Sequence, residues 1–104
     1  PYAEVEPKSI LDIIMTLRKS PEFLMDYLVC ISGTHIVDEN NTPLGFEIVY
    51  HLYSYETRKA ICVKAFVKED NPKIMSIDSV YGSANWYERE IYDLLGVVSE
   101  GSKD

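Results

Sequence analysis

The sequence predicts an α+β fold with two layers: an antiparallel meander of three to four strands, an N-terminal helix and a C-terminal helical segment. Apolar residues recur at helical spacing near both ends of the chain, and three runs rich in β-branched and aromatic residues lie between them. Short polar turns connect these runs. Because strands joined by such short connections run antiparallel, the three runs are expected to form a meander.

The first helix is expected between Pro7 and Pro21. Proline is tolerated in the first turn of a helix, and the residue before a proline is driven out of the helical conformation. The apolar positions between the two prolines recur every three to four residues, at Ile10, Leu11, Ile13, Ile14 and Leu17. Residues 2–6, which precede this helix, are expected to form either a short strand, which would be the fourth of the sheet, or an extended lead-in.

The three main strands are expected over residues 27–37, 44–53 and 58–68. Side chains alternate between the two faces of a strand, so the sequence also predicts which face is apolar. That face is formed by Phe46, Ile48, Tyr50, Leu52, Ile61, Val63, Ala65 and Val67. The helices are expected to pack on it. The opposite face is mixed in character and is a candidate for contact with a partner.

A short helical turn is expected within residues 74–81, with Ser76 as its cap and with Ile77 and Val80 facing inward. It leads into the C-terminal helix.

The C-terminal helix is expected to begin at Ser83, an N-cap residue, and to end at Gly96 in a left-handed turn. Its apolar stripe is predicted from helical spacing to be Tyr87, Ile91, Leu94, Leu95 and Val98. Residues 99–104 are expected to be disordered. Residues 1–104 are therefore interpreted as a single domain with a short disordered tail.

The composition argues against several classes of partner. The formal net charge is −7 over 104 residues, which opposes binding to nucleic acid or to an anionic lipid surface. No apolar run approaches the roughly 20 residues of a membrane span, so direct membrane insertion is not expected, nor is a signal peptide. Cys30 and Cys62 lie far apart and outside any CxxC pair. They are interpreted as small buried apolar side chains that hold no iron–sulfur cluster.

Glu88, Glu90 and Asp93 form the main acidic cluster of the C-terminal helix. A divalent metal needs further ligands that converge, and His35 and His51 on the strands are the candidates. The alternatives are a solvated or salt-bridged helix face, or a contact between subunits. No P-loop, GxGxxG motif or nucleophile elbow is present, so no catalytic, metal or cofactor site is assigned.

The run Trp86-Tyr87-Glu88-Arg89-Glu90, followed after two residues by Asp93, resembles a known signature. It is similar to that of the thirty-kilodalton subunit of respiratory complex I, which in bacteria is the C subunit of NADH–quinone oxidoreductase and has relatives in membrane-bound hydrogenases. The stretches FEIVYHLYS and KAFVKEDNP resemble a strand and an acidic turn of the same family. The resemblance extends from about residue 27 to residue 97.

The resemblance implies a small α/β subunit without its own redox centre. Such a subunit packs on the large catalytic subunit in the peripheral arm, beside an iron–sulfur subunit, on the cytoplasmic side of the membrane. Electron transfer would then belong to the complex, and this chain would not be catalytic alone. Matched residue by residue, the partner interface would be Trp86, Tyr87, Glu88, Arg89, Glu90 and Asp93. The alternatives are a stand-alone metal-dependent enzyme that uses the three carboxylates, and a free-standing protein-binding module.

Overall fold

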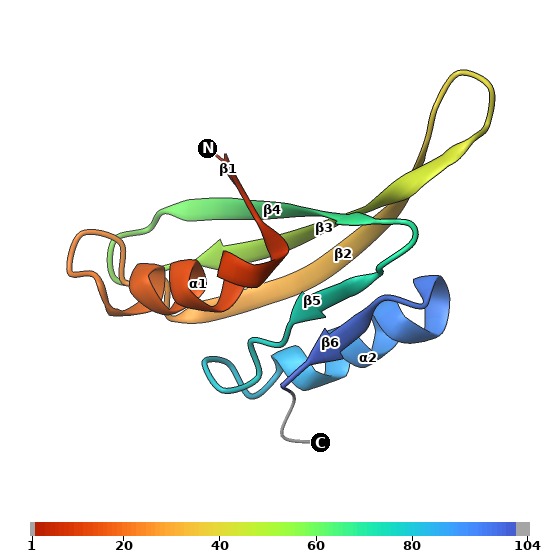
Figure 1. Ribbon diagram of the computed structural model, residues 1–104. Helices are drawn as coiled ribbons and strands as arrows, with labels where there is room; N and C mark the ends of the chain where they lie inside the picture. The colour runs from red at the N-terminus through yellow and green to blue at the C-terminus, as the bar shows by residue number, and fades with distance from the viewer. Residues whose placement is uncertain (1, 102–104) are drawn as a thin grey trace.

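The computed structural model describes residues 2–101, which form the predicted α+β fold in two layers (Figure 1). The elements in chain order are β1 (Tyr2–Val5), the 3-10 helix η1 (Pro7–Ser9), α1 (Ile10–Lys19), β2 (Tyr27–Val37), β3 (Pro43–Tyr53), β4 (Ala60–Lys68), β5 (Lys73–Met75), α2 (Ala84–Leu95) and β6 (Val98–Glu100). Neither helix is long and apolar enough to cross a bilayer within this part of the chain.

The main sheet has the strand order β1-β4-β3-β2. Strands β2, β3 and β4 form the predicted antiparallel meander, and β1 adds the fourth strand parallel to β4. The hairpin between β2 and β3 projects beyond the rest of the molecule (Figure 1). Strand β4 begins two residues later than predicted, because Arg58 adopts a left-handed conformation (φ 57°) that ends the preceding turn.

The hydrophobic core lies between the sheet and the helices, which are on the same side of the sheet (Figure 1). The predicted apolar face supplies seven of its buried side chains: Phe46, Ile48, Tyr50, Leu52, Val63, Ala65 and Val67. Helix α1 contributes Ile10 and Ile14 to this core, and α2 contributes Ala84 and Ile91. No helix covers the opposite face of the sheet within residues 2–101.

The structure differs from the sequence prediction around a second, two-stranded sheet. Lys73–Met75 forms β5, which pairs in parallel with β6. The predicted helical turn begins only after this strand, where the Val80 and Tyr81 N–H groups both donate to the Ile77 carbonyl. Ser99 and Glu100 therefore lie in a strand, although they are expected to be disordered; residues 102–104 lie outside the described part of the chain. The main-chain hydrogen bonds of this pair, such as that from Val98 N–H to the Pro72 carbonyl, account for the order.

The ends of α2 agree only partly with the prediction. Ser83 is the N-cap residue, but its side chain makes no capping hydrogen bond. Gly96 ends the helix in the left-handed region with φ 80°, as predicted. Ile77 and Val80, in the segment between β5 and α2, face the core as predicted.

Candidate functional site

Glu88 lies on the inner side of α2, where its side chain is 5% exposed. Its Oε1 accepts a hydrogen bond from the Ser76 hydroxyl at 2.6 Å, and its Oε2 accepts one from the Ile77 backbone N–H at 2.8 Å. The Ser76 hydroxyl oxygen also accepts a hydrogen bond from the Asp78 N–H at 3.2 Å. This network links α2 to the segment that follows β5.

The surroundings of Glu88 disfavour its charged form. Burial raises the pKa of the Glu88 carboxyl, the hydrogen bonds from Ser76 and Ile77 lower it in part, and the charge of Asp78 raises it further. The pKa of the Tyr50 phenol is also raised, first by its own burial and then by the charge of Glu88. The carboxyl group of Glu88 thus serves the packing of α2, whereas the resemblance placed it at a partner interface.

The buried side of α2 is rotated relative to the predicted stripe. Leu94, expected in the stripe, is 74% exposed, and Val98 belongs to β6. The side chains that face the core are Ala84, Tyr87, Glu88, Ile91 and Leu95. The prediction failed here because ionisable side chains normally remain in water, and a glutamate at a core position needs fixed hydrogen-bond donors.

Tyr87 holds α2 against the main sheet. Its ring packs against the core, and its hydroxyl donates a hydrogen bond to the Val29 carbonyl of β2 at 3.0 Å. The pairing of β2 with β3 shifts register between Leu28 and Cys30, and such irregularities leave main-chain groups unpaired within the sheet. The Tyr87 hydroxyl therefore provides a hydrogen-bond donor to a carbonyl at the irregular position of β2.

The outer side of α2 carries the other four residues of the predicted interface: Trp86, Arg89, Glu90 and Asp93. All four are exposed, and Trp86 is exposed by 77%. Arg89 and Asp93 lie four residues apart on α2 but do not pair, and Arg89 makes no ion pair within residues 2–101. The outer side of α2 is therefore an exposed helix face with a large aromatic ring and a guanidinium group that no carboxylate of the described residues neutralises.

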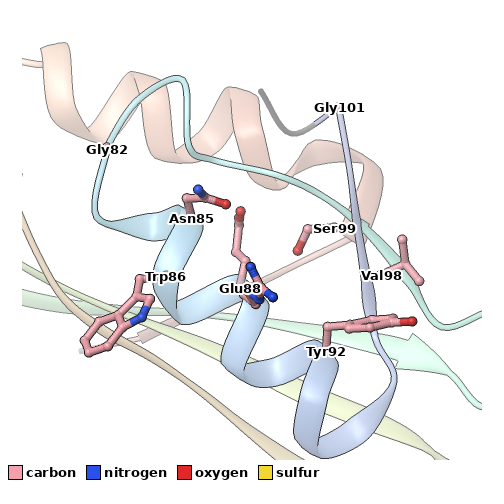
Figure 2. A pocket seen from close by; sticks show the side chains of 9 residues that line it. Gly82, Asn85, Trp86, Glu88, Tyr92, Val98, Ser99 and Gly101 are labelled. Carbon is pink, nitrogen blue, oxygen red and sulfur yellow. The ribbon is translucent and has the colours of Figure 1, made fainter. Parts of the chain in front are cut away.

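A groove of about 620 Å³ lies between α2 and β6 (Figure 2). Trp86, Arg89 and Tyr92 line it from α2, and Val98 and Ser99 line it from β6. Figure 2 shows Trp86 pointing away from β6 and Tyr92 reaching toward it, so the two rings mark opposite ends of the groove. Sequence reasoning missed Tyr92 and Ser99, because their proximity depends on the β5–β6 pair.

The three carboxylates of α2 do not converge, because Glu88 is buried while Glu90 and Asp93 are exposed. His35 and His51 lie on opposite faces of the main sheet, so the expected approach between them does not occur. Within residues 2–101, no group of three or more His, Cys, Asp or Glu side chains is placed to hold a metal ion.

Each histidine has local partners. His35 Nε2 lies 2.7 Å from Glu69 Oε1. His51 contacts the Ser32 hydroxyl at 3.2 Å and the Cys62 sulfur at 3.4 Å. Cys30 and Cys62 are free thiols and are half-buried, which is a more exposed position than the sequence prediction gave them.

Several known proteins are similar to this chain in sequence. The C subunit of NADH-quinone oxidoreductase from Roseiflexus sp. (strain RS-1) is 37% identical over 97 residues, which cover 93% of this chain and 54% of that protein. The corresponding protein from Chelativorans sp. (strain BNC1) is 43% identical over 94 residues, which cover 90% of this chain and 45% of that protein. The chain therefore spans about half the length of the curated relatives it matches.

Solved structures share the fold. A trypsin-resistant fragment of Nqo5 superposes with a TM-score of 0.83 at 25% identity and covers 99% of this chain and 80% of its own. A chain of the membrane-bound sulfane sulfur reductase, an archaeal respiratory membrane complex, superposes with a TM-score of 0.76 at 24% identity. The match covers 99% of this chain and 59% of that chain. The family described as respiratory-chain NADH dehydrogenase, 30 Kd subunit, matches residues 3–104. The chain belongs to this family of complex I-type subunits.

Proposed function

We propose that this chain is a cofactor-free structural subunit of a membrane-associated NADH–quinone oxidoreductase or of a related energy-converting hydrogenase. In this role it packs on the large catalytic subunit of the peripheral arm, beside the iron–sulfur subunit and on the cytoplasmic side. The names of the relatives support membership of a complex of this type. The packing role is supported by the geometry of α2.

The main support for this proposal is that α2 has a fixed inner side and an exposed outer side. Glu88 and Tyr87 fix the inner side through hydrogen bonds to main-chain groups of other elements. Trp86 and Arg89 stand on the outer side, and tryptophan and arginine are enriched among the residues that dominate binding energy in protein interfaces. A rigid helix presents them with little loss of conformational entropy on binding.

The charge of the chain is compatible with this role. A formal net charge of −7 favours association with a basic protein surface and increases the rate of encounter with it. We expect the large subunit to present basic residues around the site that receives α2. Glu90 and Asp93, which are exposed beside Arg89, are the residues that would meet them.

The test is binding of purified variants to the large catalytic subunit from the same organism. Trp86→Ala and Arg89→Ala are each expected to weaken binding by about 2 kcal/mol, while the melting temperature stays close to that of the wild type because both side chains are exposed. The matched controls are Tyr55→Ala and Arg58→Ala, which remove exposed residues of the same chemical types from the β3–β4 turn. Equal binding by all four variants would refute the proposal.

A further inference from the structure

Within residues 2–101, strand β6 pairs only with β5, and its other edge is open. The Val98 N–H donates to the Pro72 carbonyl, and the Ser76 N–H donates to the Glu100 carbonyl. Residues of a parallel strand bond to alternate sides, so Val98 and Glu100 use β5 while the N–H and C=O of Ser99 point to the other side. Ser99 lines the groove between β6 and α2.

The open edge lies beside a wall of large side chains. Tyr92 is 53% exposed, and it lines the groove together with Trp86 and Val98. The second sheet has only two strands, β5 and β6. Because η1 packs against β5, an added strand has access at β6. Unpaired main-chain groups next to side-chain pockets are the combination by which proteins bind an extended segment as an extra strand.

The charges of the groove indicate what that segment carries. Glu88 contributes to the lining, but both of its carboxylate oxygens accept hydrogen bonds from Ser76 and Ile77. Arg89 is the exposed charged side chain of the lining, and it makes no ion pair within residues 2–101. A guanidinium group binds a carboxylate through two parallel hydrogen bonds. The complementary segment therefore places an aspartate or glutamate opposite Arg89.

We propose that the large catalytic subunit provides an extended segment that pairs with the outer edge of β6 and fills the groove. Main-chain hydrogen bonds join it to Ser99, apolar side chains cover Tyr92 and Val98, and a carboxylate binds Arg89. This inference rests on the proposed function, because the segment belongs to the subunit that binds the outer side of α2.

Hydrogen–deuterium exchange with residue resolution tests the added strand directly. The full-length protein is compared alone and in complex with the large catalytic subunit. The Ser99 amide is expected to exchange slower by about tenfold or more in the complex, because it gains a main-chain partner. The Glu100 amide, which already faces β5, serves as the internal reference and is expected to change less.

A pair of variants at Ser99 gives a second measurement. Ser99→Pro removes the outward N–H and is compatible with an edge strand, because the bonds of Val98 and Glu100 to β5 remain. It is expected to lower affinity for the large subunit by about tenfold or more. Ser99→Ala keeps the N–H and is expected to bind like the wild type.

The outcomes separate this inference from the proposed function. Wild-type affinity of a folded Ser99→Pro protein, or unchanged exchange at Ser99 in a complex that protects Trp86, would overturn the added strand and leave the proposed function intact. Slow exchange at Ser99 in the free protein would also overturn the added strand. Protection that is independent of protein concentration would assign the groove to the protein's own continuation, and protection that depends on concentration would assign it to a second copy. Failure of the folded wild-type protein to bind the large subunit would overturn both.

Discussion

Removal of the Glu88 carboxylate is the sharpest test of how α2 is held. In a Glu88→Ala variant the Ile77 N–H and the Ser76 hydroxyl lose their acceptor while the segment around them stays buried. Each of these two buried donors left without a partner costs about 1–3 kcal/mol, so the free energy of unfolding should fall by up to about 2–6 kcal/mol. Relief of the desolvation of the carboxylate offsets part of this loss.

Glu88→Gln is the matched control. Its amide oxygen can accept the hydrogen bond from Ile77, and its amide group can donate to the Ser76 hydroxyl oxygen. The shape is conserved and no charge is buried. The loss of stability at pH 7 is therefore expected to be smaller than in Glu88→Ala, by about 1 kcal/mol or more.

The dependence on pH follows from the raised pKa of Glu88. The folded state binds the proton more tightly than the unfolded state, whose pKa is near the ordinary value of 4.5. The stability contributed by protonated Glu88 is complete below pH 4.5 and is lost as the pH rises through the folded pKa. The difference in unfolding free energy between wild type and Glu88→Gln should therefore decline over this window.

Urea titrations of the wild type and both variants between pH 4 and pH 8 would measure these effects. The difference between wild type and Glu88→Gln isolates the contribution of this carboxyl group from those of the other acidic residues. A Glu88→Ala protein as stable as the wild type would refute the buried network. A pH-independent difference between wild type and Glu88→Gln would refute the raised pKa.

Two further predictions concern the orientation of α2. Ile91→Ala should reduce the free energy of unfolding by about 2–5 kcal/mol, whereas Leu94→Ala should change it by less than about 0.5 kcal/mol, because only Ile91 faces the core. Equal losses in urea titration would mean that the helix is rotated. Tyr87→Phe should lower the free energy of unfolding by about 0.5–1.5 kcal/mol, because the hydrogen bond to the Val29 carbonyl is lost. Tyr55→Phe, at an exposed turn, should leave the free energy of unfolding almost unchanged. Indistinguishable thermal unfolding of the two variants would contradict the bond.

The main sheet could be predicted because its signal is local. Alternation along β3 and β4 assigns Tyr50 and Val63 to the same face without any knowledge of register. Gly96 likewise ends α2 for a reason contained in its own backbone, since glycine accepts positive φ at no steric cost. In these places the chain needs no distant partner to specify its structure.

The second sheet and the groove could not be predicted, because they depend on contacts between distant segments. Strands β5 and β6 have three residues each and are separated by α2, so neither shows a period that could be recognised. Glu88 looks like a solvated residue in the sequence, and its acceptor role depends on Ile77, 11 positions earlier. The position of Tyr92 beside Ser99 follows from the same packing.

The sequence order along α2 explains how one short signature can serve both stability and binding. Successive helical residues are about 100° apart, so Trp86 and Arg89 face outward while Tyr87 and Glu88, between them, face inward. The inward pair makes hydrogen bonds to Val29 and Ile77, and these bonds determine the direction in which the outward pair points. Glu88→Ala should therefore weaken binding only to the extent that it loosens α2. Glu88→Gln should recover, together, the stability and the binding that Glu88→Ala loses. A change at Arg89 should weaken binding while stability is unaffected, because its guanidinium group has no ion pair to lose within residues 2–101.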